Sequence, residues 1–444
     1  MDYYVDKIPI DMSNDTRQFL KESAMFVLKW ADWTCGTRDL REYIENHPSY
    51  LACEIVFLVC SLFTFIHAVR NGGRFVYLWI GLIIHGLNTE IIVYNTQDVD
   101  NFWHAQSVAM FFGRRMPLYV MLGLYPLFDY TASIAAKKLR LPWWAEGPAV
   151  GLGAVLLDIP YDIMGIKLLW WTWHDTDPNI YDRMYWVPWT SYYFHASFAC
   201  SFTWMLKLSR KVLLTEEYNW KLFVREFICA AFAGTTAFWV GAAQFLPVYH
   251  VFHDFYKVPT ENCVLVFLGF YAFLVWIADR NPKPDARPNK AKANYWFDEL
   301  GVVVILHYFF YIGLVLVADP ENIVFTGLLE PIGPCDQWTD VHGLISGLKL
   351  KKRRYLCPTQ YDEQYYDFHC LPNKTPPSMR DGKPLEWYTI CGTPYPNHAE
   401  YVFVIWSLCF LGLNVFYQCF ARSGDLPIPP SVKFPKRSTK KKNE

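Results

Sequence analysis

Two carboxyls inside a long apolar run are the residues of this chain best suited to chemistry. Asp158 and Asp162 lie within residues 147–173, where most of the other side chains are aliphatic or aromatic. An ionised carboxylate at the centre of a bilayer costs roughly 2.5–3.5 kcal/mol on insertion scales, so acids placed there usually serve a function. Four residues apart on a helix, the two side chains share one face. The spacing therefore predicts a pair of carboxyls that act as general acid and general base.

Other polar residues stand at a similar depth in neighbouring apolar segments. Glu90 closes one such segment and His195 opens another, and we add both to the predicted catalytic set. A structural interpretation remains open beside the catalytic one. In it, Asp162 only pairs with Lys167 or caps a helix break at Pro160, and the buried histidines serve packing.

Metal binding has one weak candidate in the sequence. His250 and His253 are spaced by about one helical turn and could hold a metal from one face. The repeated histidine boxes of membrane di-iron enzymes do not occur, nor do phosphate-binding, dinucleotide-binding or serine-hydrolase motifs. We therefore expect no cofactor.

The composition predicts an all-α polytopic membrane protein. Hydrophobic residues make up 53% of the 444 residues, and the 19 Trp and 29 Tyr are typical of aromatic belts at bilayer faces. The net charge of −1 provides no basic excess for binding nucleic acid. A run of about 20 apolar residues suffices to cross a bilayer. We predict nine such spans, at 50–69, 75–94, 111–134, 148–171, 190–209, 227–247, 261–278, 299–318 and 401–421.

Basic residues give this topology an orientation. Lys and Arg concentrate in alternate connections, around Arg70, Lys137, Lys207 and residues 280–292, which are then cytosolic. The N-terminus is predicted in the lumen and the C-terminus in the cytosol. The expected units are a luminal tail (1–49), a membrane domain of eight helices (50–318), a luminal loop (319–399), a ninth span (400–421) and a basic cytosolic tail (422–444).

The long loop carries features of an oxidising compartment. Its cysteines form an even set, which suits two disulfides with three alternative pairings: Cys335, Cys357, Cys370 and Cys391. Asn14 and Asn373 begin glycosylation sequons, and both fall on the predicted luminal side.

The last residues of the chain resemble a retrieval signal. Lys441 and Lys442 stand fourth and third from the end, as in the dilysine signal of endoplasmic-reticulum membrane proteins. A generic basic tail attracted to anionic lipid is the alternative. The signal predicts residence in the endoplasmic-reticulum membrane and recognition of the tail by coat proteins.

Residues 16–31 are apolar at helical spacing. Such a helix could lie on the membrane surface or pack on the luminal part of the protein. The sequence does not choose between the two.

Short aromatic motifs around Asp158 resemble a known family. Leu157-Asp158, Trp171-Thr-Trp173 and the Tyr-Trp-Val-Pro-Trp turn at 185–189 are similar to the core of the membrane carotenoid hydratases (bisanhydrobacterioruberin hydratase and its relatives) over about residues 81–204. In that family an acid in one span precedes a Trp-x-Trp and a Tyr-Gly-Val-Pro-Trp-like turn, and Glu90 fits its acid in an earlier span. Trp186 stands where the family often has Gly.

The resemblance implies a multi-helix bundle that adds water to a terminal isoprenoid double bond. In this reaction Asp158 would protonate the alkene, and Asp162 or Glu90 would orient the water. The expected ligand is then an isoprenoid or other membrane lipid. The alternative from another class is a non-enzymatic transporter or a scaffold or cargo factor, for which the loop 319–399 would be a recognition module.

Overall fold

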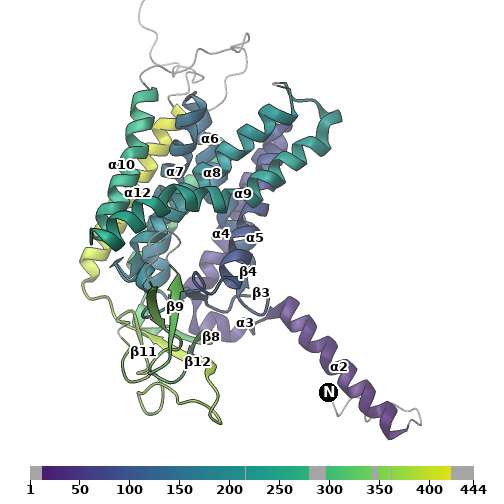
Figure 1. Ribbon diagram of the computed structural model, residues 1–444, viewed down its shortest axis with the longest axis vertical. Coiled ribbons are helices and arrows are strands. Elements are labelled where there is room, and N and C mark those ends of the chain that lie inside the picture. The colour runs from purple at the N-terminus through teal and green to yellow at the C-terminus, as the bar shows by residue number, and fades with distance from the viewer. Residues whose placement is uncertain (1–12, 216, 280–296, 343–348, 362, 422–444) are drawn as a thin grey trace, which may run out of the picture.

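Long helices make up most of the molecule, and short strands gather at one end of it (Figure 1). The computed structural model describes residues 13–215, 217–279, 297–342, 349–361 and 363–421. Within these ranges, seven helices are long and apolar enough to cross a membrane. They are α4 (Pro48–Asn71), α5 (Arg74–Asn95), α7 (Trp143–Lys167), α9 (Phe223–Tyr249) continued by η5 (His250–Phe255), α10 (Thr260–Asp279), α11 (Glu299–Val317) and α12 (His398–Ala421). The prediction of a helical membrane protein is confirmed at this level.

Two of the nine predicted spans are not among these seven. The third, at 111–134, is replaced by strands and irregular helix: β3 (Ala109–Phe111), β4 (Met116–Pro117), the π-helices η1 (Val120–Leu124) and η2 (Pro126–Tyr130), and α6 (Thr131–Lys138). Pro126 has no N–H to donate, which favours such a local departure from α-helical hydrogen bonding. The fifth corresponds to α8 (Trp189–Leu213), a helix of 25 residues with a more polar composition. Nine spans therefore remain a prediction.

The strands form a region that we call the β end. Its largest sheet is antiparallel, in the order β11 (Tyr366–Asp367), β12 (Leu385–Gly392), β8 (Val324–Ile332). A second three-stranded sheet has the order β1 (Cys35–Thr37), β3, β4. The remaining strands pair two by two: β9 (Trp338–His342) with β10 (Lys349–Arg353), β2 (Phe102–His104) with β5 (Trp171–Trp173), and β6 (Arg183–Met184) with β7 (Val187–Pro188). Further short elements are the helix α3 (Leu40–Asn46) and the 3₁₀ turns η3 (Pro178–Ile180), η4 (Trp220–Leu222) and η6 (Pro320–Asn322).

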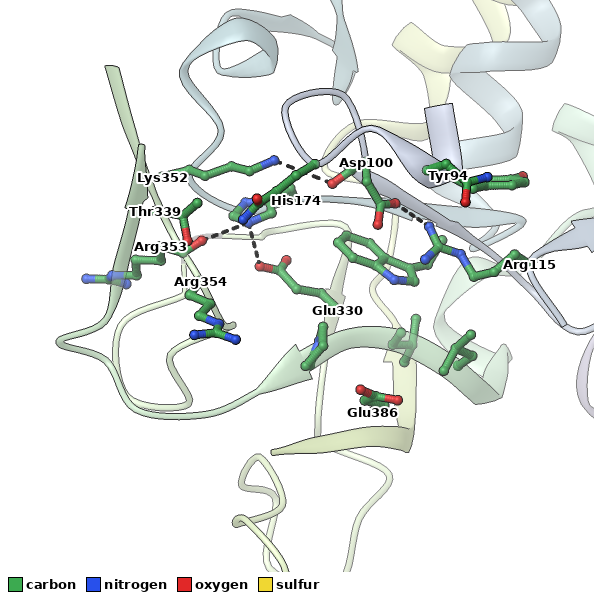
Figure 2. A pocket seen from close by; sticks show the side chains of 16 residues that line it. Tyr94, Asp100, Arg115, His174, Glu330, Thr339, Lys352, Arg353, Arg354 and Glu386 are labelled. Atoms are coloured by element: carbon green, nitrogen blue, oxygen red, sulfur yellow. Dashed lines mark hydrogen bonds and ion pairs between the residues drawn. The ribbon is translucent and has the colours of Figure 1, made fainter. Parts of the chain in front are cut away.

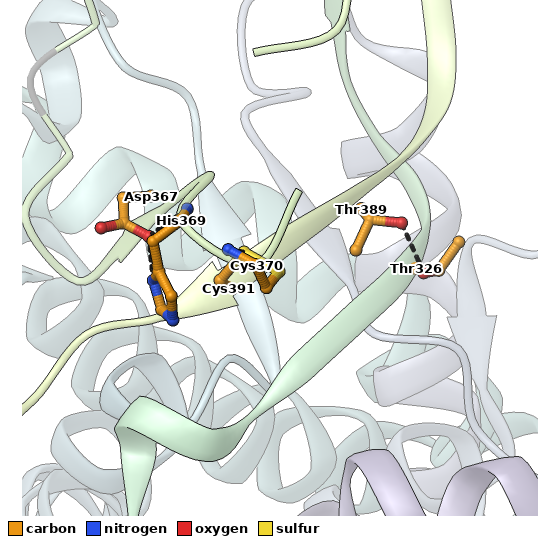
Figure 3. The surroundings of a disulfide bond; sticks show 6 residues. All are labelled: Thr326, Asp367, His369, Cys370, Thr389 and Cys391. Atoms are coloured by element: carbon orange, nitrogen blue, oxygen red, sulfur yellow. Dashed lines mark hydrogen bonds and ion pairs between the residues drawn. A yellow bond between two sulfur atoms is a disulfide. The ribbon is translucent and has the colours of Figure 1, made fainter. Parts of the chain in front are cut away.

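Two disulfides close the β end, as the cysteine count predicts. Cys335 pairs with Cys357 and Cys370 with Cys391, so each bond joins two cysteines that follow one another in the loop, 22 and 21 positions apart. Figure 3 shows the second bond beside Asp367 and His369. Because Cys391 is oxidised, its sulfur is not a thiolate ligand for a metal held with those two residues.

The connection between α7 and α8 and the loop 319–399 both contribute strands to the β end. The amide of Trp173 donates to the hydroxyl of Tyr365 at 3.0 Å. Lys352 on β10 forms a 3.0 Å ion pair with Asp177. These contacts join residues 192 and 175 positions apart, so the two connections pack together as one unit.

The N-terminal helix α2 (Asn14–Thr34) projects from the β end (Figure 1). It buries none of its residues, and Phe26 keeps 70% of its surface accessible. The alternative in which this helix packs along the rest of the protein is therefore not what the structure shows. Asn14 and Asn373 are both exposed, which leaves glycosylation a prediction. Lys441 and Lys442 lie outside the described residues.

Helices α7 and α8 approach one another unusually closely. A Cβ built on Gly151 of α7 would lie 2.3 Å from the carbonyl oxygen of Ala196 on α8. A Cβ on Gly147 would lie 2.5 Å from Nε1 of Trp204. Small residues allow such backbone contact between membrane helices, and here the contact brings the acids of α7 against the polar side of α8.

Candidate functional site

Three of the four predicted catalytic residues meet between α7 and α8. One donor atom from each of Asp158, Asp162 and His195 lies within 4.8 Å of the other two. The two acids follow one another by a helical turn on α7, and the histidine comes from the first half of α8. The structure thus brings three of the four residues together, and their N and O atoms would also suit a divalent cation.

The two acids differ in their surroundings. Asp162 accepts a hydrogen bond of 2.8 Å from Ser191 on α8. Asp158 is fully buried, and neither of its oxygens has a hydrogen-bond partner within the described residues, although Nε2 of His195 lies 3.3 Å from Oδ1. A charge without hydrogen bonds is costly in an apolar interior. The arrangement therefore favours a proton on Asp158 and the negative charge on Asp162.

The imidazole of His195 is the accessible member of the cluster. Its side chain keeps 23% of its surface open, whereas the Asp158 side chain has none. The ring of Phe128 stands edge-on to the imidazole at 6.2 Å between centroids. A ligand or proton that reaches this cluster therefore meets the histidine first, beside an aromatic wall.

Glu90, the fourth predicted residue, lies elsewhere. Its Oε1 accepts a 3.1 Å hydrogen bond from the hydroxyl of Tyr125, and its helix α5 packs mainly on α9. Glu90 is not in the group formed by Asp158, Asp162 and His195. A catalytic role for Glu90 therefore stays a prediction, and the structure gives its carboxyl a tyrosine partner outside the group.

The structural interpretation of Asp162 is also wrong in its details. Lys167 donates to Oγ1 of Thr393 at 3.1 Å and to the carbonyl of Pro394 at 2.9 Å, not to Asp162. Pro160 lies inside a continuous α7, so there is no helix break to cap.

His250 and His253 contact different oxygens of the same carboxylate, that of Asp254. Nδ1 of His250 lies 2.6 Å from one Asp254 oxygen, and Nδ1 of His253 lies 2.9 Å from the other. The pair lies on the π-helix η5 rather than on a regular helix face. Metal binding by these two histidines stays a prediction.

Ser191 is the site residue that sequence reasoning missed. It stands four positions before His195, so the two share a face of α8, and this spacing was the signal available. Serine is common in membrane helices, however, and only the position of Asp162 across the interface gives its hydroxyl a role.

We expect Ser191→Ala to lower the free energy of unfolding by about 2 kcal/mol, because hydrogen bonds to charged groups contribute roughly 1.5–3 kcal/mol. Unfolding of the detergent-solubilised protein, followed by tryptophan fluorescence, measures the change. Ser197→Ala on the same helix is the matched control, since its buried hydroxyl has no hydrogen-bond partner within the described residues. Equal effects of the two substitutions would show that the Asp162 contact is not stabilising.

Comparison with known proteins gives a family and no activity. A family model described as "Domain of unknown function (DUF7802)" matches residues 1–421. No curated protein and no solved structure matches the chain.

Proposed function

The chain belongs to the family described as domain of unknown function DUF7802, and we propose that it is a membrane enzyme that performs acid–base chemistry on a lipid or isoprenoid. The observation that carries this proposal is the convergence of Asp158, Asp162 and His195 within 4.8 Å between two tightly packed helices. Structural charges in membranes are usually paired one by one. Here a carboxyl without a hydrogen-bond partner stands beside a hydrogen-bonded carboxyl and an accessible imidazole, which is an acid–base constellation.

The residues divide the work by their surroundings. Asp158, held protonated by its apolar site, is the general acid. Asp162, which keeps its charge through Ser191, draws a proton toward the cluster, and His195 carries it between the ligand and the carboxyls. Asp158 gives its proton to the ligand. It is then reprotonated by the proton that the ligand or water releases.

Water addition to an isoprenoid double bond, the reaction that the resemblance to carotenoid hydratases implies, is one reaction this cluster could perform. Protonation of the alkene by Asp158 makes a tertiary cation, which an aromatic wall such as Phe128 stabilises. A water then adds to the cation and loses its proton to His195 or Asp162. Glu90 has no part in this scheme, because it lies apart from the cluster.

The cellular address proposed from the sequence is the endoplasmic-reticulum membrane. Two disulfides at the β end suit an oxidising lumen. With the β end luminal, α12 leads the chain toward the cytosol, where a dilysine tail can meet coat proteins.

The test is a lipid analysis of cells that lack the protein and are complemented with variants. Asp158→Asn removes the transferable proton with little change in shape, and general acids typically contribute 10²–10⁴-fold to rate. We expect the lipid that accumulates without the protein to accumulate equally with Asp158→Asn. Glu54→Gln is the matched control: Glu54 is also buried in a long apolar helix, but it accepts a 2.6 Å hydrogen bond from Tyr43 away from the cluster.

Three outcomes separate the candidate functions. Wild type and Glu54→Gln should restore the lipid profile at equal protein abundance, and Asp158→Asn should not. Full restoration by Asp158→Asn would contradict the enzymatic role. No lipid change on loss of the protein would contradict it too, and would favour the scaffold or transporter alternative.

A further inference from the structure

A second group of possible metal ligands lies at the β end, apart from the intramembrane cluster. His174 and Asp175 directly follow β5, and Glu330 comes from β8. One donor atom from each lies within 4.8 Å of the other two. All three side chains are nearly closed to solvent, with 4%, 2% and 4% of their surface accessible.

The carboxyls of this group lack the partners that buried acids need. Both oxygens of Asp175 and Oε1 of Glu330 have no hydrogen bond within the described residues. The other Glu330 oxygen accepts only the Asp175 amide, at 3.2 Å. Two buried carboxylates side by side repel one another unless a proton or a cation lies between them.

The neighbouring cationic side chains are engaged with other partners. Lys352 pairs with Asp177 at 3.0 Å, and Arg183 with Glu363 at 2.8 Å. The guanidinium of Arg353 donates to the side chain of Gln360 at 2.7 Å. In the described part of the chain none of these three side chains forms an ion pair with Asp175 or Glu330, so their positive charges act on the group only from farther away.

We propose that His174, Asp175 and Glu330 bind a divalent cation of the zinc or manganese type. One imidazole with two carboxylates is a donor set that these ions accept. Nδ1 of His174 lies 3.5 Å from Oδ1 of Asp175, and Nε2 lies 3.2 Å from Oε1 of Glu330. The ion takes one ring nitrogen, so one of these two separations is between neighbouring ligands; the third ligand atom lies within 4.8 Å of both and would move closer to form bonds of about 2.0–2.2 Å.

The surroundings of His174 suit a metal-bound imidazole. Its Nε2 lies 3.0 Å from the carbonyl of Arg353, and histidine ligands commonly donate their second N–H to such a carbonyl. Nδ1 then faces Asp175, and a metal there would replace the amide of Thr176, now 3.2 Å away, as its partner.

A pocket gives the ion a path from solvent. A cavity of about 430 Å³ is lined by His174 and Glu330 together with residues of β10 and the end of α5. Figure 2 shows the imidazole linked to both Glu330 and Arg353 at the wall of this pocket. Bound there, the cation would clamp the α7–α8 connection onto β8.

Metal binding is tested on the purified full-length protein in detergent. The protein carries Asp158→Asn and Asp162→Asn to remove the intramembrane donor set, is stripped with EDTA, and is then titrated with Zn²⁺ alone and with Mn²⁺ alone. Competition with a chromogenic chelator measures affinity, and elemental analysis measures the number of ions bound. We expect one equivalent of at least one metal and a higher melting temperature with it.

The matched pair of variants is Glu330→Gln and Glu386→Gln. Both acids line the same pocket, but only Glu330 belongs to the proposed ligands. We expect Glu330→Gln to weaken binding at least 100-fold and to abolish the rise in melting temperature, and Glu386→Gln to change neither. Asp175→Asn is the second ligand variant, used if Glu330→Gln does not fold as judged by its melting in EDTA.

Two results would overturn the proposal. One is the absence of stoichiometric uptake of either metal by the protein with an intact β-end group. The other is equal binding by a folded ligand variant and by Glu386→Gln, because the carboxyls would then share a proton rather than hold an ion.

Discussion

Arg183→Met should lower the free energy of unfolding of the β end by roughly 3–5 kcal/mol, the usual effect of removing one partner of a buried ion pair. The guanidinium donates to both Glu363 oxygens at 3.0 and 2.8 Å, and the Glu363 side chain is 1% accessible. A further bond, 2.8 Å to the carbonyl of His174, joins two residues of the α7–α8 connection, to which Arg183 itself belongs. Methionine fills most of the volume but leaves the carboxylate without its cation. Denaturant unfolding of the oxidised protein above about pH 8, where wild-type Glu363 is ionised, measures the loss.

The double variant Arg183→Met, Glu363→Leu is the control for charge. An apolar pair of similar volume is often as stable as the ion pair it replaces, so we expect the double variant to recover most of the stability. If single and double variants are equally unstable, the packing of Arg183 rather than the unpaired carboxylate of Glu363 is the cause.

The defect of Arg183→Met should also depend on pH. Burial raises the pKa of Glu363 to about 8 even with Arg183 beside it, and without the arginine the pKa rises further. A carboxyl whose pKa is higher in the folded than in the unfolded state contributes stability below its unfolded pKa and loses it as pH rises through the folded pKa. Up to about pH 8 both proteins lose stability alike, so the difference between wild type and Arg183→Met should be small below about pH 7 and should grow above about pH 8, where only the wild-type Glu363 ionises.

Local spacing in the sequence was enough to predict that the two acids of α7 lie together. Asp158 and Asp162 stand four apart in an apolar run, and a helix of that run must place both on one face. His195 was predicted from its depth alone, and the structure brings it to 3.3 Å from Asp158. The cysteine count predicted two disulfides, although only the fold selects the pairing.

Contacts between distant segments were beyond sequence reasoning. His174 and Glu330 are 156 positions apart in the sequence, and no local periodicity relates them. The partners of Lys167 are Thr393 and Pro394, which reach it only because the connection before α12 folds back over α7. The Tyr125 partner of Glu90 could not be predicted either, since depth in the membrane does not tell which side chain is the neighbour.

Gly151→Ala tests whether the tight contact between α7 and α8 supports the cluster of Asp158, Asp162 and His195. Its new Cβ would fall 2.3 Å from the carbonyl oxygen of Ala196, a backbone atom that cannot rotate away. Added carbon in a packed interior typically costs about 1–3 kcal/mol, and we expect a loss near the upper end, about 3 kcal/mol in the free energy of unfolding. Gly269→Ala on α10 is the control, because no atom of the described chain lies within 4 Å of its Cβ position.

The same substitution should separate the acids from the histidine. Ala196 follows His195 directly, so a carbonyl pushed away from α7 takes the imidazole with it and lengthens the 3.3 Å approach to Asp158. Gly151→Ala should then fail to restore the lipid profile at a temperature where the folded protein persists, whereas Gly269→Ala restores it. A stable Gly151→Ala protein with full activity would mean that the tight contact between α7 and α8 is not what holds Asp158 and His195 together.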